Sequence, residues 1–463
     1  MTSLSDIRSW LDANLAQRLE KHQVPGANLA VYQGGQVIEA AAGLLSLDTG
    51  VEATTDAVFQ IGSITKVLTT SLVMQLVDSG AVDLDAPVRR YLPEFRVADA
   101  DASAAITVRQ LMTHTSGFEG DLFIETTKED DAVERFVADV LPTVAQPLAP
   151  GTLFSYNNAG FVVLGRIVEV LRGKPYVAVL RERLADPLGM SSLCVTADEA
   201  ILHRAAVGHV KSEADGQWHP VKVWGLAHSN TPAGATPNLP AGQLINLARL
   251  HLSGGLAPDG TRLLSEESVA AMRQPQVDIP RRTRLDSRIG LAWHLFDTAD
   301  GVMVSHDGGT LGQIAFLGTW PDRDLAVAVL TNGGNPAALL RDVAGHILSE
   351  LGGASLPPEL ELPETPAPVD NPERYVGRYT GRLSKFEVTE VDGGLSLTID
   401  FGDLAAQSGA ERYLTRDLVR VDGEIFACPG DDGAIAATFA FIGSDDSGRA
   451  RFLHNHRANP RVE

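Results

Sequence analysis

The chain contains 463 residues with a formal net charge of −21 at pH 7, and 44% of its residues are hydrophobic while 21% are charged. This composition is typical of a folded protein, and the length predicts about two or three domains. So negative a chain is repelled by a nucleic-acid backbone and by an anionic membrane, which argues against both as partners.

The sequence shows no pattern of export, membrane insertion or metal binding. Residues 1–22 form a polar amphipathic pattern without the basic segment, apolar core and cleavage site of a secretory signal. No run of residues is apolar for long enough to span a bilayer. Cys194 and Cys428 lie far apart and fit neither a disulfide framework nor a metal-ligand spacing. We therefore expect a cytoplasmic protein that needs no metal and no cofactor.

The first 352 residues predict one α/β domain whose strands lie near its two ends. Residues 26–46 alternate apolar stretches with a Gly-Gly pair and predict an early hairpin. Residues 61–79 are apolar around most of a helix circumference, which predicts a buried central helix. Helical and loop segments follow, and strand-like runs then precede a closing helix at residues 335–352. The late strands are expected to complete the sheet that the hairpin begins.

The remainder of the chain predicts a linker and a second domain. Residues 353–372 contain repeated prolines and little hydrophobic content, which is typical of a stiff, extended linker. Residues 373–463 contain short strand-like runs separated by turns such as Asp392-Gly393-Gly394. This pattern predicts a small antiparallel β-barrel.

The buried helix carries a serine and a lysine three residues apart, Ser63 and Lys66. Residues at this spacing share one face of a helix, so Ser63 Oγ and Lys66 Nζ can meet. Burial disfavours the ammonium form of the lysine, which leaves a neutral amine able to act as a base. The pair on its own also arises by chance in a chain of this length. A G-x-S-x-G elbow is excluded because Ile61 and Thr65 stand where glycines are needed.

Two further segments carry candidate catalytic groups. Tyr156 and Asn158 lie in a turn before an apolar helix, where a tyrosine can relay a proton if a nearby cation lowers its pKa. Asn158 can orient a lysine or hold a substrate amide. His306 opens a glycine-rich segment in which the amide of Gly309 is a candidate oxyanion donor. A helix cap and a glycine turn are the structural alternatives, and His114 is interpreted as structural.

Taken together, Ser63-Ile64-Thr65-Lys66, Tyr156-Asn157-Asn158 and His306-Asp307-Gly308 resemble the three active-site motifs of the serine β-lactamase and penicillin-binding-protein superfamily, class C branch. The resemblance covers roughly residues 10–350, including ITVRQLMTHTSGF and ADPLGM. It implies an α/β fold in which an antiparallel sheet is flanked by helices, with a helical subdomain. It also implies that Ser63 is acylated, that Lys66 and Tyr156 move protons, and that the amides of Ser63 and Gly309 form the oxyanion hole.

The third motif departs from the common pattern, because His306 stands where most members carry a lysine. A histidine is mostly neutral at pH 7, so the position is poorly suited to anchoring a free substrate carboxylate. It suits an ester, amide or thioester instead. Esterases, D-aminopeptidases and penicillin-binding-protein-type thioesterases share this variant. The chain most resembles the last group, stand-alone cyclases with a catalytic domain, a proline linker and a lipocalin-like barrel.

The resemblance implies that Ser63 takes a linear nonribosomal peptide from the thioester of a peptidyl carrier protein. The peptide's own N-terminal amine then closes a head-to-tail lactam, and the residue esterified to Ser63 is a D-amino acid. The barrel is expected to cover the cleft and exclude water. The alternatives are a hydrolase with the same residues (a D-stereospecific aminopeptidase, an amidase or an esterase) and, more remotely, a non-catalytic β-lactam or peptide receptor.

Substrate-binding residues are expected in two places. The loop at residues 221–234 is the candidate pocket for the D-residue, with Trp224 as a wall and Gly234 allowing close approach. In the barrel, Arg451 and Arg457 are expected to reach the cleft and meet peptide carbonyls. A basic patch at residues 279–290, including Arg281 and Arg282, is a candidate docking site for the carrier protein, with a solvated loop as the alternative.

Overall fold

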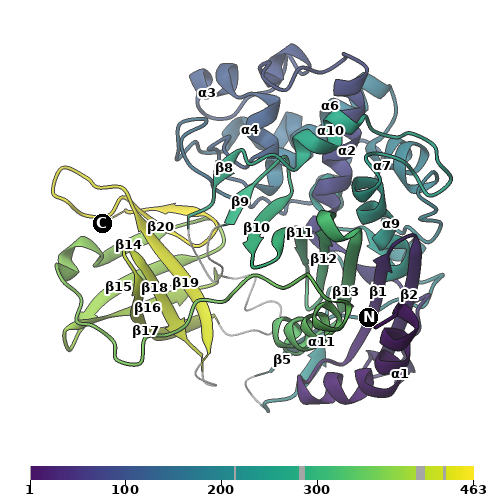
Figure 1. The fold of residues 1–463 in the computed structure, drawn as a ribbon. Coiled ribbons are helices and arrows are strands. Elements are labelled where there is room, and N and C mark those ends of the chain that lie inside the picture. Colours follow the sequence, from purple (N-terminus) through teal and green to yellow (C-terminus); the bar gives the residue numbers. More distant parts are fainter. Residues whose placement is uncertain (1, 213–214, 281–286, 403–411, 431–433, 463) are drawn as a thin grey trace.

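The computed structural model describes residues 2–212, 215–280, 287–402, 412–430 and 434–462. A large domain built on one sheet and a smaller β-barrel lie side by side (Figure 1). Within the described ranges, no helix combines the length and the apolar character that crossing a membrane requires.

The large sheet joins strands from both ends of the α/β domain, as the sequence predicts. The early hairpin consists of β1 (Gly26–Gln33) and β2 (Gln36–Ser46). Its strand β1 pairs antiparallel with β13 (Leu325–Thr331), with Ala27 opposite Thr331. In the order β3-β2-β1-β13-β12-β11-β10-β9-β8, the other strands are β3 (Val51–Glu52), β12 (Ile314–Trp320), β11 (Gly301–Gly309), β10 (His294–Thr298), β9 (Ser287–Ile289) and β8 (Val277–Asp278).

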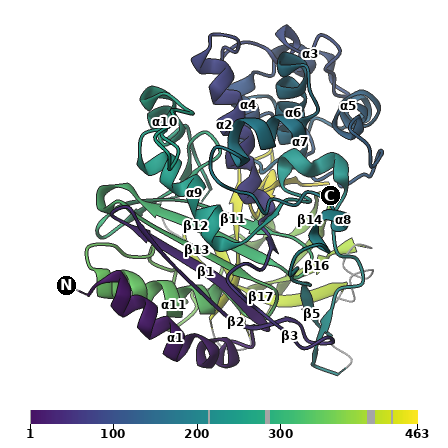
Figure 2. The same cartoon turned by 90° about the vertical axis from the view of Figure 1, so that its right-hand side faces the viewer.

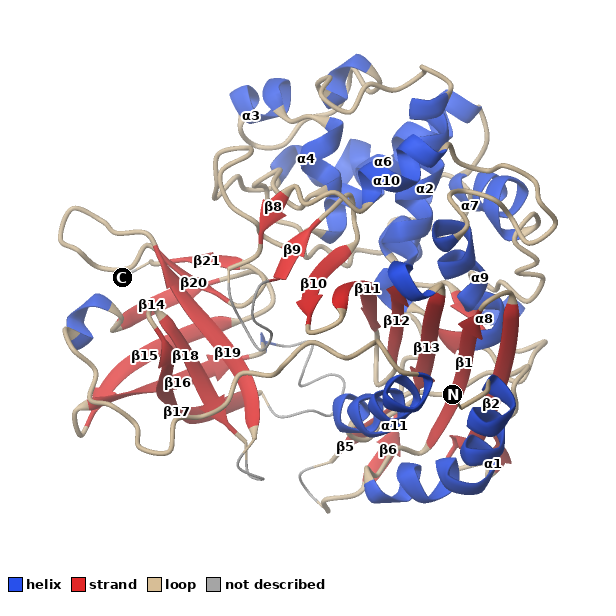
Figure 3. Ribbon diagram, in the orientation of Figure 1, coloured by secondary structure: helices blue, strands red, loops and turns tan. Residues whose placement is uncertain are grey.

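Helices cover both faces of this sheet (Figures 2 and 3). Successive side chains of a strand point to opposite faces, and in β13 Val327 and Val329 enter one core while Ala328 and Leu330 enter the other. The first core contains α1 (Leu4–Lys21) and α11 (Pro336–Leu351). The second contains α2 (Thr65–Asp78), α6 (Asn158–Arg172) and α9 (Ala241–Leu252). The site lies against this second face.

Helix α2 is the predicted buried helix and is buried around nearly its whole circumference. It begins at Thr65, because Gly62–Ile64 form a preceding 3₁₀ turn, η1. The short helices of the domain are α3 (Ala100–Ala105), α4 (Val108–Met112), α5 (Ala132–Arg135), α7 (Tyr176–Leu180), α8 (Ala197–Ala200) and α10 (Glu266–Met272), and α7 and α10 contact α2. Two small ribbons pair β4 (Phe59–Gln60) with β7 (Asn238–Leu239) and β5 (His209–Lys211) with β6 (Trp218–Pro220).

The C-terminal region folds as the predicted antiparallel barrel. Its eight strands follow chain order, and a bridge between Tyr379 and Arg461 joins the first strand to the end of the last. Aromatic side chains such as Tyr375, Phe426 and Phe441 fill its core. The strands are β14 (Gly377–Thr380), β15 (Lys385–Val391), β16 (Gly394–Asp400), β17 (Tyr413–Asp422), β18 (Ile425–Pro429), β19 (Ile435–Ile442), β20 (Phe452–His454) and β21 (Ala458–Pro460).

The hairpin formed by β20 and β21 attaches the barrel to the α/β domain just before α6. The amide of Tyr156 donates to the carbonyl of His456 at 2.7 Å. His454 Nε2 lies 2.8 Å from the carbonyl oxygen of Phe154, and the amide of Ala458 donates to Ser155 Oγ at 3.2 Å. The barrel therefore contacts the segment that contains one of the predicted catalytic residues.

Candidate active site

Ser63 and Lys66 lie side by side at the start of α2. Lys66 Nζ is hydrogen bonded to Ser63 Oγ at 2.9 Å and donates to the carbonyl of Ala233 at 2.6 Å. Glycine backbone packs tightly around the serine. A Cβ on Gly234 would lie 2.1 Å from the carbonyl oxygen of Gly62, and one on Gly62 would lie 2.7 Å from the amide nitrogen of Gly309. The end of β11 is therefore held directly against the turn that carries Ser63.

The environment of Lys66 favours its neutral form. The side chain is fully buried, and it lies 4.8 Å from the ring centroid of Tyr156. Burial, with a smaller contribution from the charge of Arg457, lowers the pKa of Lys66 well below its usual range, while Asp121 opposes the shift. A neutral amine 2.9 Å from the hydroxyl of Ser63 can accept its proton.

Tyr156 is partly buried among other rings, and its pKa is raised rather than lowered. The ring of His114 stacks on it with centroids 4.3 Å apart, and Arg457 Cζ lies 5.0 Å from its centroid. Burial raises the pKa of the Tyr156 phenol, which outweighs the opposing hydrogen bond with Ser63 and the charge of Arg457. A nearby cation is present, but Tyr156 remains a neutral phenol that can relay a proton by accepting one and donating another.

Asn158 and Arg457 both donate hydrogen bonds to the carboxylate of Asp121, a residue that the sequence did not single out. Asn158 Nδ2 donates to Asp121 Oδ1 at 2.8 Å. Arg457 Nε and Nη2 donate to the two oxygens of the same carboxylate, at 2.5 and 2.9 Å. The sequence allowed a helix cap as the structural role of this segment. In the structure the cap is Asn157, whose side chain accepts a hydrogen bond from the amide of Gly160. Asn158 is therefore available to the site, and its orientation is fixed by Asp121.

His306 is buried and neutral. Its Nδ1 lies 2.6 Å from the carbonyl oxygen of Asp307, whereas its Nε2 has no hydrogen-bond partner among the described residues. Burial and the nearby Lys66 lower the pKa of His306 to about 3. The position therefore carries no positive charge at neutral pH and offers no ionic partner to a substrate carboxylate.

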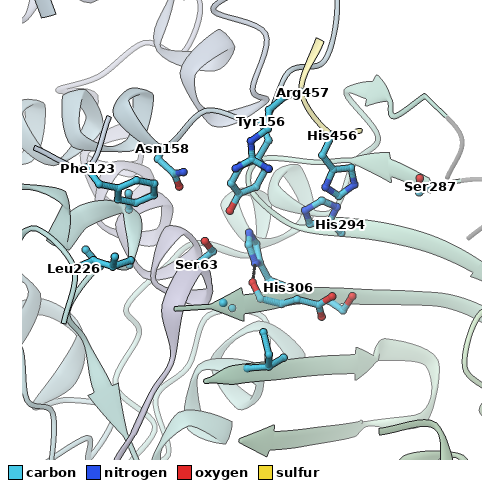
Figure 4. Close-up of a pocket in the computed structure, with 18 of the residues that line it drawn as sticks. Ser63, Phe123, Tyr156, Asn158, Leu226, Ser287, His294, His306, His456 and Arg457 are labelled. Carbon is cyan, nitrogen blue, oxygen red and sulfur yellow. Dashed lines mark hydrogen bonds between the residues drawn. The ribbon is translucent and has the colours of Figure 1, made fainter. Parts of the chain in front are cut away.

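These residues surround a cavity of about 490 Å³ (Figure 4). Ser63, Tyr156, Asn158, His306 and Gly309 all line it. The amide nitrogen of Gly309 lies against Gly62, next to Ser63 in the chain, so the amides of Ser63 and Gly309 remain the predicted oxyanion donors.

Of the predicted substrate-binding residues, Gly234 and Arg457 also line the cavity. Trp224 and Arg451 are not part of its lining. The indole of Trp224 instead donates to the carbonyl of Ala206 at 2.9 Å, and exposed Arg451 packs over the ring of Phe452. Arg281 and Arg282 of the predicted docking patch lie outside the described residues.

Sequence reasoning also missed His294 and His456, which line the cavity. Neither belongs to a recognisable motif, and His456 reaches the site only because the barrel docks there. His114, in contrast, has the structural role that the sequence indicates, since its ring is buried with Nδ1 accepting from the amide of Asn157.

Comparison with known sequences places the α/β domain among serine enzymes of one family. The Beta-lactamase family model matches residues 11–351. Penicillin-binding protein 4 of Amycolatopsis lactamdurans is 40% identical over 367 residues, which are 79% of this chain and 95% of that protein. Esterase EstB of Burkholderia gladioli is 33% identical over 234 residues, which are 47% of this chain and 58% of the esterase.

Solved structures extend the likeness to the barrel. The crystal structure of SurE with D-Leu has a TM-score of 0.77 and 27% identity, and the match covers 99% of this chain and 100% of SurE. A class C β-lactamase from Rhodobacter sphaeroides has a TM-score of 0.55 and 21% identity, covering 74% of this chain and 99% of the β-lactamase. The predicted class C fold with an additional C-terminal barrel is confirmed.

Proposed function

Because the chain belongs to the β-lactamase and penicillin-binding-protein superfamily, a group of serine hydrolases and acyltransferases, we propose that it is a peptide cyclase. Its substrate is a linear nonribosomal peptide held as a thioester on a peptidyl carrier protein. Ser63 takes over the acyl group, and the peptide's N-terminal amine releases it as a head-to-tail lactam.

The observation that carries this proposal is that the barrel helps to line the cavity of Ser63, while the third motif places no cation there. Arg457 and His456 of the barrel line the same cavity as Ser63, and the neutral His306 takes the place of a lysine. A cavity with walls from both domains favours an amine held close to the acyl-enzyme over bulk water. A neutral third motif suits an acyl group that has no free carboxylate.

Acylation follows from the positions of Ser63, Lys66 and Tyr156. Neutral Lys66 accepts the proton of Ser63, and Oγ attacks the thioester carbonyl while the amides of Ser63 and Gly309 stabilise the oxyanion. The C–O bond to Ser63 forms and the C–S bond breaks. The departing thiolate receives the proton that Lys66 took from Ser63, relayed through the Tyr156 hydroxyl, so that Lys66 is neutral again.

Cyclisation reverses the proton movements. The neutral N-terminal amine attacks the ester carbonyl, so that a C–N bond forms and the C–O bond to Ser63 breaks. The proton lost by the amine passes through Tyr156 to Lys66, and Lys66 returns it to Ser63. The products are the lactam and free Ser63, and no water is consumed.

Two observations support a D-residue at the acylated end of the peptide, namely the cavity lining and one similar solved structure. The small residues Ala233, Gly234 and Ala235 line the cavity beside Ser63, with Leu226 and Phe123 as apolar walls. The structure of SurE was solved with D-Leu, which supports a D-residue as the one esterified to Ser63. The carrier protein is a further part of the proposal, implied by the thioester chemistry.

A hydrolase is the second candidate, because the relatives include an esterase, EstB. The two functions share the acyl-enzyme and differ only in whether an amine or water attacks it. The masses of their products therefore separate them.

The test uses a pair of synthetic peptidyl thioesters that differ only in the configuration of the last residue. We expect wild-type protein to release thiol and lactam from the D-peptide, and Ser63→Ala to release neither. Linear acid as the only product of the wild type would support the hydrolase. Equal turnover of the D- and L-peptides would contradict the stereochemical part.

A further inference from the structure

The cavity around Ser63 has two lobes, one on each side of the group formed by Ser63, Tyr156 and His306 (Figure 4). We call the first the acyl lobe; its lining includes Phe123, Asn158, Leu226 and residues 233–235. We call the second the histidine lobe; it is lined by Ser287, His294, Phe296, Ser305 and His456. The proposed function uses the acyl lobe and leaves the histidine lobe without a role.

The histidine lobe is a built surface to which both domains contribute. The rings of His294 and Phe296 on β10 stack with centroids 6.2 Å apart, and the ring of His456 from the barrel stacks on His294 at 5.8 Å. Ser305 lies opposite His294 in the register of β10 and β11. The surface thus combines flat aromatic faces with hydroxyl groups, which suits an amino-acid residue.

His306 lines the cavity between the two lobes and carries a buried ring nitrogen without a hydrogen-bond partner among the described residues. A carbonyl oxygen only accepts hydrogen bonds, so the contact of Nδ1 with the carbonyl of Asp307 requires Nδ1 to carry the proton. Nε2 of a neutral ring is then an acceptor. It is buried, lacks a partner among the described residues, and belongs to a ring that lines the cavity and lies 5.1 Å from that of His294. A hydrogen bond from an N–H or O–H group, of a ligand or of water, would satisfy it.

The order of the two steps in the proposed reaction indicates which part of the substrate each lobe binds. The side chain of the acylated residue occupies the acyl lobe in both halves of the reaction. By microscopic reversibility, the nucleophile that resolves the acyl-enzyme approaches from the side that the leaving group vacates. The histidine lobe is the part of the cavity on that other side.

The geometry points to the histidine lobe as the binding site of the peptide's N-terminal residue, with His306 Nε2 accepting a hydrogen bond from its amine. This inference rests on the proposed cyclisation and adds its second specificity pocket. The lobe holds the neutral amine while its lone pair attacks the ester carbonyl. His456 and Phe296 are therefore specificity-determining residues for the first residue of the peptide, as Leu226 is for the last.

The experiment uses synthetic peptidyl thioesters that share one D-configured last residue and differ only in the first residue, which is Gly, Leu or Trp. Thiol release measures acylation, and mass spectrometry gives the ratio of lactam to linear acid. In the wild type we expect the first residue to change this ratio by about tenfold or more, and to change thiol release much less.

Variants then assign the effect to one lobe. Phe296→Ala enlarges the histidine lobe, and His456→Asn removes a ring while keeping a residue that tolerates the φ of 75° found there. Both are expected to alter the ranking of first residues. Leu226→Ala should alter the dependence on the last residue instead. Val302→Ala on β11, which is 39% exposed and does not line the cavity, is the control.

A lactam-to-acid ratio that does not depend on the first residue overturns the inference but leaves the proposed cyclase function standing. The inference is also overturned if Phe296→Ala and His456→Asn lower thiol release and lactam formation in equal proportion. Wild-type protein that yields only linear acid from every peptide removes the proposed cyclisation and the inference together. Thermal unfolding of each variant shows that the compared proteins are folded.

Discussion

The N-terminal end of α2 and the loop between β20 and β21 reach the same cavity by opposite routes. Ser63 and Lys66 are three residues apart and meet because a helix places them on one face. Arg457 meets Asp121 across 336 residues, and only because the barrel docks on the segment before α6. The first arrangement follows from local periodicity, whereas the second follows from how two domains pack.

The difference suggests a division of labour. In the proposed reaction, the α/β domain supplies the nucleophile, its base and the oxyanion amides that form the acyl-enzyme. The barrel contributes His456 and Arg457 to the cavity lining, and in the proposal these residues influence what attacks the acyl-enzyme. Variants of the α/β-domain groups and variants of the barrel groups should therefore impair different steps of the reaction.

The largest effect is expected at the local pair. Lys66→Arg keeps a long side chain but replaces a neutral amine with a permanent cation, because an arginine does not release its proton. We expect thiol release to fall by about 10²- to 10⁴-fold. Lys174→Arg, at a largely exposed lysine paired with Glu182, is the control. Near-normal thiol release by Lys66→Arg would remove Lys66 from its role as the base.

A smaller effect is expected when the domain contact is broken. Asp121→Ala releases both Asn158 and Arg457, and we expect lactam formation to fall by about 10²-fold through misplacement of these groups. Arg457→Ala removes the same ion pair from the barrel side. If Asp121 acts through Arg457, the double variant loses less than the sum of the single changes. Additive losses in such a cycle would show that the two residues act independently.

The acidic limb of the pH profile should shift in opposite directions when Arg457 or Asp121, the two partners of that ion pair, is neutralised. Thiol release should rise with pH as Lys66 loses its proton, because only the neutral amine accepts from Ser63. Burial and the charge of Arg457 lower the pKa of Lys66, whereas Asp121 raises it. Arg457→Met should therefore move the acidic limb of kcat/KM to higher pH, and Asp121→Asn to lower pH. Shifts in the same direction would contradict this electrostatic account.

The smallest effects are expected at the two predicted binding residues that the structure places elsewhere. Trp224→Phe and Arg451→Ala should leave lactam formation within about twofold of the wild type, as for changes away from a functional site. Arg457→Ala is the matched comparison for Arg451→Ala, since both arginines belong to the barrel. A large loss with Arg451→Ala would mean that the substrate contacts a wider part of the barrel than the cavity lining.

The sequence predicted those features that depend on local pattern or on complete motifs. Ser63, Lys66, Tyr156 and His306 belong to short motifs, and the structure brings their side chains together at the cavity. Asp121 was not predicted because its role depends on Asn158 and Arg457, neither of which is near it in sequence. Trp224 was placed in the pocket because it lies in the correct loop, but its indole turns to Ala206 instead. The sequence left the direction of the Tyr156 pKa shift open, because burial, which outweighs the nearby cation, is a tertiary property.

The most direct test of the proposed cyclisation is the mass of the product released from a carrier-bound peptide in water enriched in oxygen-18. We expect a product one water lighter than the linear acid and free of the heavy isotope, because the amine rather than water resolves the acyl-enzyme. A linear acid that carries oxygen-18 as the only product would contradict the proposed cyclisation.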